Sequence, residues 1–279
     1  MGLLQPWHSD YASQSKPKPV ETLPGRVCSV ACGVCHSVAV LATGLVYSWG
    51  WGEHGQLGHG SKRGYPVPKL VEALPEPVRS VAASNASSFA VSVNGRVYSW
   101  GASEYGELGH EDMNEDGDGH AHELLPRPVQ ALLQECITAV VAGRMHSLAL
   151  AADGAIFSWG FGIDGQLGRA EAATTRCCSN WMPERVALEG GGGMAAAGEA
   201  HSLAVVRDGR LFGWGSGRNC ALGLELDEDD NGDAVDQITP WEYPTLRALS
   251  SAECETQAPA KSLCAGAARV VKSYEILSF

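Results

Sequence analysis

The residues Leu45 to Gly58 read LVYSWGWGEHGQLG, and close copies of this stretch recur three times along the chain. The copies are RVYSWGASEYGELG at 96–109, AIFSWGFGIDGQLG at 155–168 and RLFGWGSGRNCALG at 210–223. Successive tryptophans of the repeat are separated by 51, 59 and 55 residues. Self-similarity at a period near 50 residues is typical of propellers, solenoids and repeat arrays. The repeat therefore decides the fold class before any other signal.

Each copy predicts a β-hairpin. A two-residue turn opens it, and pairs such as Asn94-Gly95 and Asp153-Gly154 accept the positive φ angles of a tight turn. An aromatic residue stands two positions before each tryptophan, so the two side chains share one face of a strand. A Leu-Gly turn ends each copy and is expected to place its leucine against the sheet. We expect all four tryptophans to be core residues: Trp49, Trp100, Trp159 and Trp214.

Together these residues resemble the regulator of chromosome condensation (RCC1-like) repeat family. The family signature is Gly-x-x-His-Ser, then a turn glycine, Trp-Gly, and Gly-x-Leu-Gly. Its first element begins at Gly33, Gly143 and Gly198. The resemblance covers roughly residues 19–249, and it implies an all-β fold, a β-propeller of four-stranded antiparallel blades.

Two copies depart from the family signature. The second copy has Ser84 and Ser87 where glycine and histidine stand in the others. The fourth has Cys220 where the other three have glycine. The remaining residues recur in register, so these departures leave the fold assignment unchanged.

The repeats predict an incomplete ring. Residues 1–24 are interpreted as the tail of a partial repeat, 25–249 as four complete repeats, and 250–279 as a linker and the start of a further repeat. The family's seven blades would need about 350 residues at roughly 50 per blade. An open arc would expose sheet faces, which self-association or a partner would cover.

Composition restricts the partners. A formal net charge of −12 disfavours nucleic acid, because an acidic surface repels phosphate. The sequence has no apolar run long enough to span a membrane and no basic, apolar start typical of a secretory signal. Nine cysteines without framework spacing indicate free thiols in a reducing compartment. We therefore expect a cytoplasmic or nuclear protein that binds neither nucleic acid nor membrane.

The repeated histidines and the cysteine cluster have structural interpretations. His36, His146 and His201 occupy equivalent positions in separate repeats and cannot converge on one substrate, so we expect each to bond backbone in its own blade. Cys28, Cys32 and Cys35 have the spacing of an iron–sulfur ligand set. Cys32, however, stands where other repeats carry alanine, which indicates a small buried strand residue.

Other motifs lack the context that their chemistry requires. Gly50-x-Gly52-x-x-Gly55 matches a dinucleotide fingerprint, but a Leu-Gly turn follows it instead of a helix. The sequence shows no nucleophile elbow, zinc-spaced ligand set or phosphate loop. We therefore assign no catalytic, cofactor-binding or metal residue and expect no enzyme activity, with guanine-nucleotide exchange as the one open question.

One loop matches a calcium-binding pattern. Residues 112–123 fit the twelve-residue loop D-x-[DN]-x-[DN]-G-x5-E, from Asp112 to Glu123. Pro126 and Pro128 exclude an immediate exit helix, and an acidic insertion explains the same residues. We expect no cofactor, and calcium at 112–123 remains the alternative.

The resemblance implies a non-catalytic protein-interaction propeller that scaffolds or regulates a small-GTPase, trafficking or ubiquitin pathway. Its candidate binding loops are the insertions at 111–125, 169–182 and 225–241. Two alternatives are a guanine-nucleotide exchange factor for a Ran-like small GTPase and a calcium-modulated binding module. Ultraviolet-B photoreception, another function within the family, depends on a Gly-Trp-Arg-His-Thr run that the chain lacks.

Overall fold

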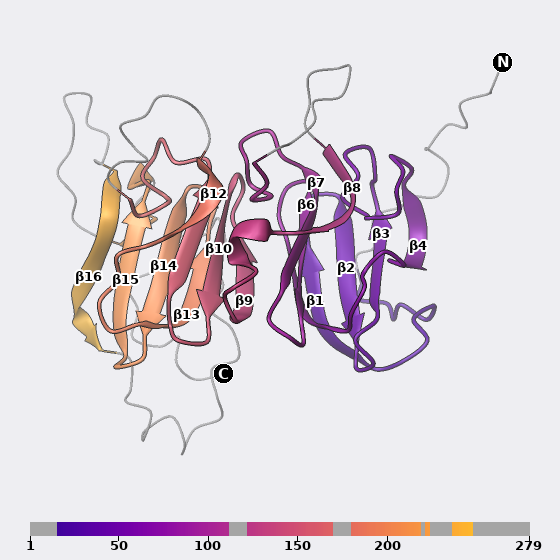
Figure 1. Ribbon diagram of the computed structural model, residues 1–279, viewed down its shortest axis with the longest axis horizontal. Helices are drawn as coiled ribbons and strands as arrows, with labels where there is room; N and C mark the ends of the chain where they lie inside the picture. The colour runs from indigo at the N-terminus through magenta and orange to yellow at the C-terminus, as the bar shows by residue number, and fades with distance from the viewer. Residues whose placement is uncertain (1–15, 112–121, 170–179, 219–220, 224–235, 248–279) are drawn as a thin grey trace.

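The computed structural model describes residues 16–111, 122–169, 180–218, 221–223 and 236–247 (Figure 1). Its described part contains sixteen β-strands and one 3-10 helix. The first two sheets hold β1 (Val27–Cys32), β2 (His36–Leu41), β3 (Val46–Gly50), β4 (Tyr65–Leu70), β5 (Val78–Ala83), β6 (Ser87–Ser92), β7 (Val97–Ala102) and β8 (His122–Pro128). The other two hold β9 (Ile137–Ala142), β10 (His146–Ala151), β11 (Ile156–Gly160), β12 (Asn180–Arg185), β13 (Gly192–Ala197), β14 (His201–Val206), β15 (Arg210–Gly215) and β16 (Gln237–Arg247).

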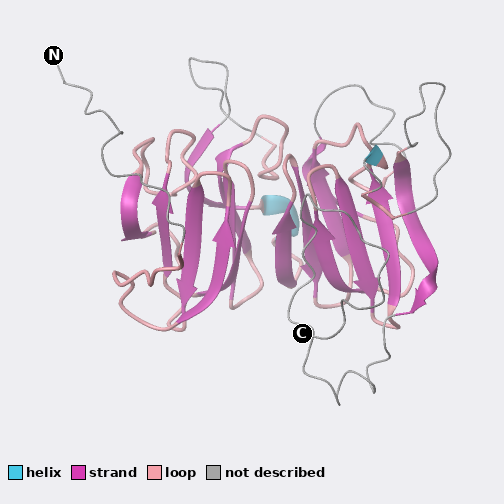
Figure 2. Cartoon of the chain, turned by 180° about the vertical axis from the view of Figure 1, so that it is seen from behind, coloured by secondary structure: helices cyan, strands magenta, loops and turns pink. Residues whose placement is uncertain are grey.

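The strands form four antiparallel sheets, each in simple chain order, as expected for propeller blades. The orders are β1-β2-β3-β4, β5-β6-β7-β8, β9-β10-β11-β12 and β13-β14-β15-β16. The first strands of successive sheets contact one another, so they form the inner side of the arc. The fourth strands lie outermost, and all four of them carry the prolines that suit an edge. The four sheets lie side by side in both views (Figures 1 and 2).

The hairpins form where the sequence predicts them. The turn glycine between the second and third strands has a positive φ in every blade, between 80° and 93°. A side chain at that φ would be strained, so Asn-Gly and Asp-Gly fix the register of the central strand pair.

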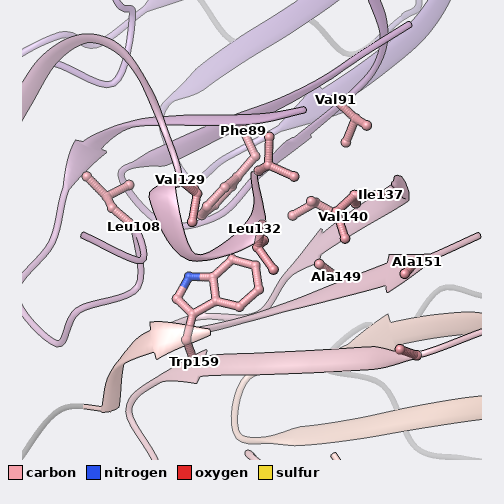
Figure 3. Close-up of a cluster of buried hydrophobic side chains, with 12 residues drawn as sticks. Phe89, Val91, Leu108, Val129, Leu132, Ile137, Val140, Ala149, Ala151 and Trp159 are labelled. Atoms are coloured by element: carbon pink, nitrogen blue, oxygen red, sulfur yellow. The ribbon is translucent and has the colours of Figure 1, made fainter. Parts of the chain in front are cut away.

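Hydrophobic cores lie between adjacent blades, not within a blade. Between the second and third blades, Phe89 meets Trp159 edge to face, with ring centroids 6.4 Å apart. The short helix η1 (Gln130–Leu132) lies between the same two blades and buries Leu132 (Figures 2 and 3). Each interior takes side chains from two blades, so every blade is stabilised by its neighbours.

The first blade departs from the expectation of a uniform core. Trp100, Trp159 and Trp214 are fully buried, whereas Trp49 is only half-buried. The described residues place no blade before the first, so no described sheet packs on the face that carries Trp49. For the same reason the predicted burial of Cys32 is wrong, because this side chain is exposed.

The fourth blade replaces a serine by a combination of glycine and tyrosine. Ser48, Ser99 and Ser158 each donate a hydroxyl hydrogen bond to the leucine carbonyl of their own Leu-Gly turn, at 2.6–2.7 Å. The fourth blade has Gly213 at this position, and the Tyr243 hydroxyl donates to the Leu222 carbonyl instead. A Cβ at Gly213 would lie 2.5 Å from the tyrosine oxygen, so glycine makes room for the substitute.

Candidate interaction face and blade junctions

Each blade junction within the described chain is closed by the tryptophan of the following blade. Its indole N–H donates to the backbone carbonyl of the residue before the Leu-Gly pair in the preceding blade. The pairs are Trp100 with Gln56 at 2.9 Å, Trp159 with Glu107 at 2.8 Å and Trp214 with Gln166 at 2.9 Å. The repeated tryptophan therefore joins two blades in addition to filling a core.

A serine of the following blade donates to the same carbonyl. The serines are Ser88, Ser147 and Ser202, with oxygen–oxygen distances of 2.8, 3.0 and 2.9 Å. In two junctions a histidine of the preceding blade lies against this serine hydroxyl. These pairs are His36 with Ser88 at 2.8 Å and His146 with Ser202 at 2.9 Å.

The prediction that His36 and His146 bond backbone in their own blade is therefore wrong. His36 and His146 bond the next blade's serine and not the backbone of their own blade, because their side chains point across the junction. Ser87, which replaces histidine in the second blade, donates instead to the Ala102 carbonyl at 2.8 Å. Burial lowers the pKa of His36 to about 4 and that of His146 to about 3, so both remain neutral hydrogen-bonding groups at pH 7.

One end of the blades carries the variable positions of the repeat. Here the turns between first and second strands meet the loops between third and fourth strands, and we name this end the long-loop face. Its described residues are 33–35, 51–64, 84–86, 103–111, 143–145, 161–169, 198–200, 216–218, 221–223 and 236. The three predicted binding insertions fall in sequence in the connections between third and fourth strands, and their residues 112–121, 170–179 and 224–235 lie outside the described residues.

Apolar side chains are exposed on the long-loop face. Val34 is 74% exposed, Trp51 41% and Ile163 45%. Tyr105 and Phe161 lie edge to face on the same end of the blades, with ring centroids 5.1 Å apart. Exposed apolar side chains gathered on one face indicate a binding surface more strongly than scattered ones.

Charged side chains surround these apolar residues. Glu53 and Glu104 are exposed, and Arg144 forms an ion pair with Glu199 across two neighbouring turns. A hollow of about 150 Å³ opens among them, lined in part by Trp51, Tyr105 and Glu107.

Glu107 is the most perturbed acid on this face. It is 6% exposed and accepts a hydrogen bond from the backbone N–H of Tyr105 at 2.9 Å. Gln56 makes the equivalent contact with His54 in the first blade, at 3.0 Å. Burial raises the pKa of Glu107 to about 7, whereas an amide at the same position carries no charge to desolvate.

These face residues are not among the residues predicted from the sequence, although the repeat contains a signal for them. The position after Trp-Gly is Trp51, Ala102, Phe161 and Ser216 in the four copies, while the framework around it stays constant. A loop position that varies while the framework around it stays constant is a candidate position for binding a partner. The comparison of Glu107 with Gln56 and Gln166 would have marked the buried acid in the same way.

The remaining sequence motifs fall into three groups. Cys28, Cys32 and Cys35 are free thiols on the first blade, and among the described residues no group of histidine, cysteine or acidic side chains is placed to hold a metal. The glycine-rich stretch ending at Gly55 is a blade turn. The calcium pattern lies outside the described residues except for its last two positions, where the Glu123 carboxylate is 3.7 Å from the Arg127 guanidinium.

In the described part, no helix is long and apolar enough to cross a membrane.

The family model described as "RCC1-like domain" matches residues 1–267. The chain belongs to the RCC1-like domain family. This assignment confirms the resemblance inferred from the repeats, and with the four-bladed sheet arrangement it confirms the propeller fold.

Curated relatives agree with the RCC1-like assignment, and a solved structure agrees with the fold. The chain is 37% identical over 222 residues to the Arabidopsis thaliana ultraviolet-B receptor UVR8, covering 78% of this chain and 46% of the receptor. It is 34% identical over 225 residues to the human E3 ubiquitin-protein ligase HERC2, covering 76% of this chain and 4% of the ligase. Saccharomyces cerevisiae Prp20p superposes with a TM-score of 0.71 at 24% identity, covering 88% of this chain and 61% of Prp20p. The RCC1-like chain thus spans less than half of the two curated relatives.

Proposed function

We propose that the RCC1-like chain is a non-catalytic interaction propeller that binds a protein partner through its long-loop face. The observation that carries the proposal is the exposure of Val34, Trp51 and Ile163 on one end of a rigid blade array. Backbone hydrogen bonds hold two of these positions, from Val34 N–H to the Asn85 carbonyl and from Trp51 N–H to the Cys35 carbonyl, so little backbone entropy is lost when a partner covers them. Relatives in this family include a receptor and a ubiquitin ligase, which supports an interaction or regulatory role.

The chemistry of the face restricts the partner. Exposed acids such as Glu53 and Glu104 stand beside the apolar side chains, and the whole chain carries a net charge of −12. A partner with an apolar patch flanked by lysine or arginine fits this surface best. Association should slow as salt increases, because screening weakens long-range attraction.

We infer scaffolding or regulation of a small-GTPase, trafficking or ubiquitin pathway in the cytoplasm or nucleus. The similarity to HERC2 supports the ubiquitin branch, because this chain matches a 225-residue part of a ligase that is many times longer. A scaffold of this kind would contribute binding and leave the chemistry to other domains or proteins.

Affinity capture with matched variants tests the face. The wild-type chain is compared with a Trp51→Ala/Glu104→Lys double variant and with Val93→Glu, whose substitution lies on a hairpin at the opposite end of the blades. A partner retained by wild type and Val93→Glu but lost by the double variant supports the proposal. Equal retention by all three chains would show that the long-loop face is not the binding surface.

An exchange assay separates the scaffold from the guanine-nucleotide exchange factor. An exchange factor must bind the nucleotide-free GTPase more tightly than the loaded form, since only differential affinity shifts the equilibrium. We expect the chain to release fluorescent nucleotide from a panel of small GTPases weakly or not at all. Strong nucleotide release from one GTPase by a substoichiometric amount of the chain would contradict the scaffold hypothesis and support an exchange factor.

A further inference from the structure

The hollow on the long-loop face opens where the first three blades meet. Each of these blades lines it with the turn between its first two strands, which supplies Val34 and Cys35, Asn85 and Ala86, and Arg144 and Met145. The loops after the third strands of the first two blades complete the wall. The volume of about 150 Å³ has room for several water molecules or for the head group of one side chain.

Glu107 places a buried carboxylate in this hollow. The hydrogen bonds to the carboxylate come from backbone N–H groups of its own loop, those of Glu104, Tyr105 and Glu107. Among the described residues, no basic side chain forms an ion pair with it. A buried charge that is compensated only by backbone dipoles is costly, and a counter-ion would offset that cost.

The first blade shows that the loop does not require this charge. Gln56 occupies the equivalent position, lines the same hollow and accepts a hydrogen bond from the His54 N–H at 3.0 Å. One side-chain oxygen is enough for that contact, and either an amide or a carboxylate supplies it. The second atom differs, because the amide nitrogen donates whereas the carboxylate oxygen accepts. Glu107 therefore adds a charged acceptor that the fold of the loop does not need.

The wall beside this carboxylate is aromatic. Trp51 and Tyr105 line the hollow, and Trp51 is 41% exposed. Glu104, which is exposed, adds a second negative charge to the lining, and the charge of Arg144 is already paired with Glu199. A guanidinium group stacks on aromatic rings, pairs with carboxylates through two parallel hydrogen bonds and is more weakly hydrated than an ammonium group. The lining thus matches arginine better than lysine.

We propose that the hollow receives an arginine side chain of the protein partner, with its guanidinium paired to the Glu107 carboxylate and lying against the rings of Trp51 and Tyr105. This arginine site rests on the proposed function, because the arginine belongs to the partner that the long-loop face binds. Charge-assisted pairs of this kind are stronger than neutral hydrogen bonds. Buried arginine anchors are also enriched among the residues that dominate the binding energy of interfaces.

Titration with a single arginine tests the site without a protein partner. The probe is N-acetyl-arginine methylamide, added at pH 8, above the pKa of about 7 that burial gives Glu107. Nuclear magnetic resonance follows the Trp51 indole and the backbone amides around the hollow, and we expect saturation in the millimolar range. The citrulline derivative, which has nearly the same shape and no charge, should bind about tenfold more weakly.

Two charge-matched variants locate the site. Glu107→Gln installs the residue that the first and third blades carry, so it should fold, and it should weaken arginine binding about tenfold without changing citrulline binding. Glu53→Gln removes the same charge from an exposed position of the face outside the lining, and should change arginine binding less than about twofold.

Four outcomes would overturn the arginine site. They are no binding of the arginine derivative by the wild-type chain, equal affinity for the arginine and citrulline derivatives, unchanged arginine binding in Glu107→Gln, and equal losses in the two variants. The capture experiment on the long-loop face is a separate measurement. A partner retained equally by wild type and Glu107→Gln would contradict the arginine and leave the face as the binding surface.

Discussion

The first and second blades carry nearly the same hairpin, VYSWG, but differ in what surrounds it. Trp100 is fully buried and bonds the Gln56 carbonyl, whereas no described residue accepts a hydrogen bond from the half-buried Trp49 indole. The motif thus specifies the strand and the turn, and the preceding blade supplies the burial. Stability of a repeat array is accordingly a sum of blade and junction terms.

Tryptophan truncation should give the largest difference between the two blades. We expect Trp100→Ala to lower the free energy of unfolding by ~3–5 kcal/mol, as for a core aromatic. Trp49→Ala should cost under ~2 kcal/mol, since Trp49 is only partly buried. Urea denaturation at submicromolar chain measures both. Equal losses would show that the first blade is covered as completely as the second.

The junction histidines extend the comparison to the fourth blade. His146 bonds Ser202 in a following blade, whereas the described residues place no blade after His201. Replacing His146 by alanine should therefore cost ~2 kcal/mol, and the same change at His201 under ~1 kcal/mol. Thermal or urea unfolding at pH 7 distinguishes the two variants. A larger loss at His201 would contradict the cross-blade role.

The same pair predicts a pH effect. Burial lowers the pKa of His146 from 6.5 to about 3. Between these two pH values the histidine is protonated in the unfolded chain and neutral in the folded chain. Stability is therefore lost as the pH falls from 6.5 toward 3, and His146→Ala should reduce that slope by ~1.4 kcal/mol per pH unit. A variant with the wild-type slope between pH 6 and 4 would show that His146 does not contribute to the pH dependence.

Glu107 and Gln56 allow an opposite pH test at equivalent positions. Burial raises the pKa of Glu107 from 4.5 to about 7. The stabilisation from its neutral form is therefore complete below pH 4.5 and is lost as the pH rises through 7. Glu107→Gln should be more stable than wild type at pH 8, by on the order of 1 kcal/mol, and similar to it at pH 4.5. The reverse change, Gln56→Glu, should destabilise the chain at pH 8. Unchanged pH profiles in both variants would contradict the burial argument.

Calcium should have the smallest effect. We expect millimolar calcium to leave the melting temperature unchanged, because the one described acid of the 112–123 pattern, Glu123, already lies near Arg127. Differential scanning calorimetry with and without chelator is the measurement. A rise in melting temperature that Glu123→Gln abolishes would instead establish a calcium loop.

The sequence predicted what recurs within one repeat and missed what depends on neighbours. Strand order, hairpin glycines and buried turn leucines follow from register, because each is set by residues close in the chain. The exposure of Cys32 and the contact from His146 to Ser202 depend on the presence or absence of an adjacent blade. The long-loop face could be located only through positions that vary among the copies. The repeat period itself reports the shared framework residues and not the residues that differ between blades.

Gly213 and Tyr243 constrain which substitutions the fourth blade can accept. A serine at position 213, as in the other copies, would place its Cβ 2.5 Å from the tyrosine oxygen. Loss of Tyr243 alone would leave the Leu222 carbonyl without its hydroxyl donor. Each single step therefore passes through a less stable protein, while the paired change restores the arrangement of the other blades. The two positions are therefore epistatic. A change of the fourth blade toward the sequence of the other three is favoured only when both residues change together.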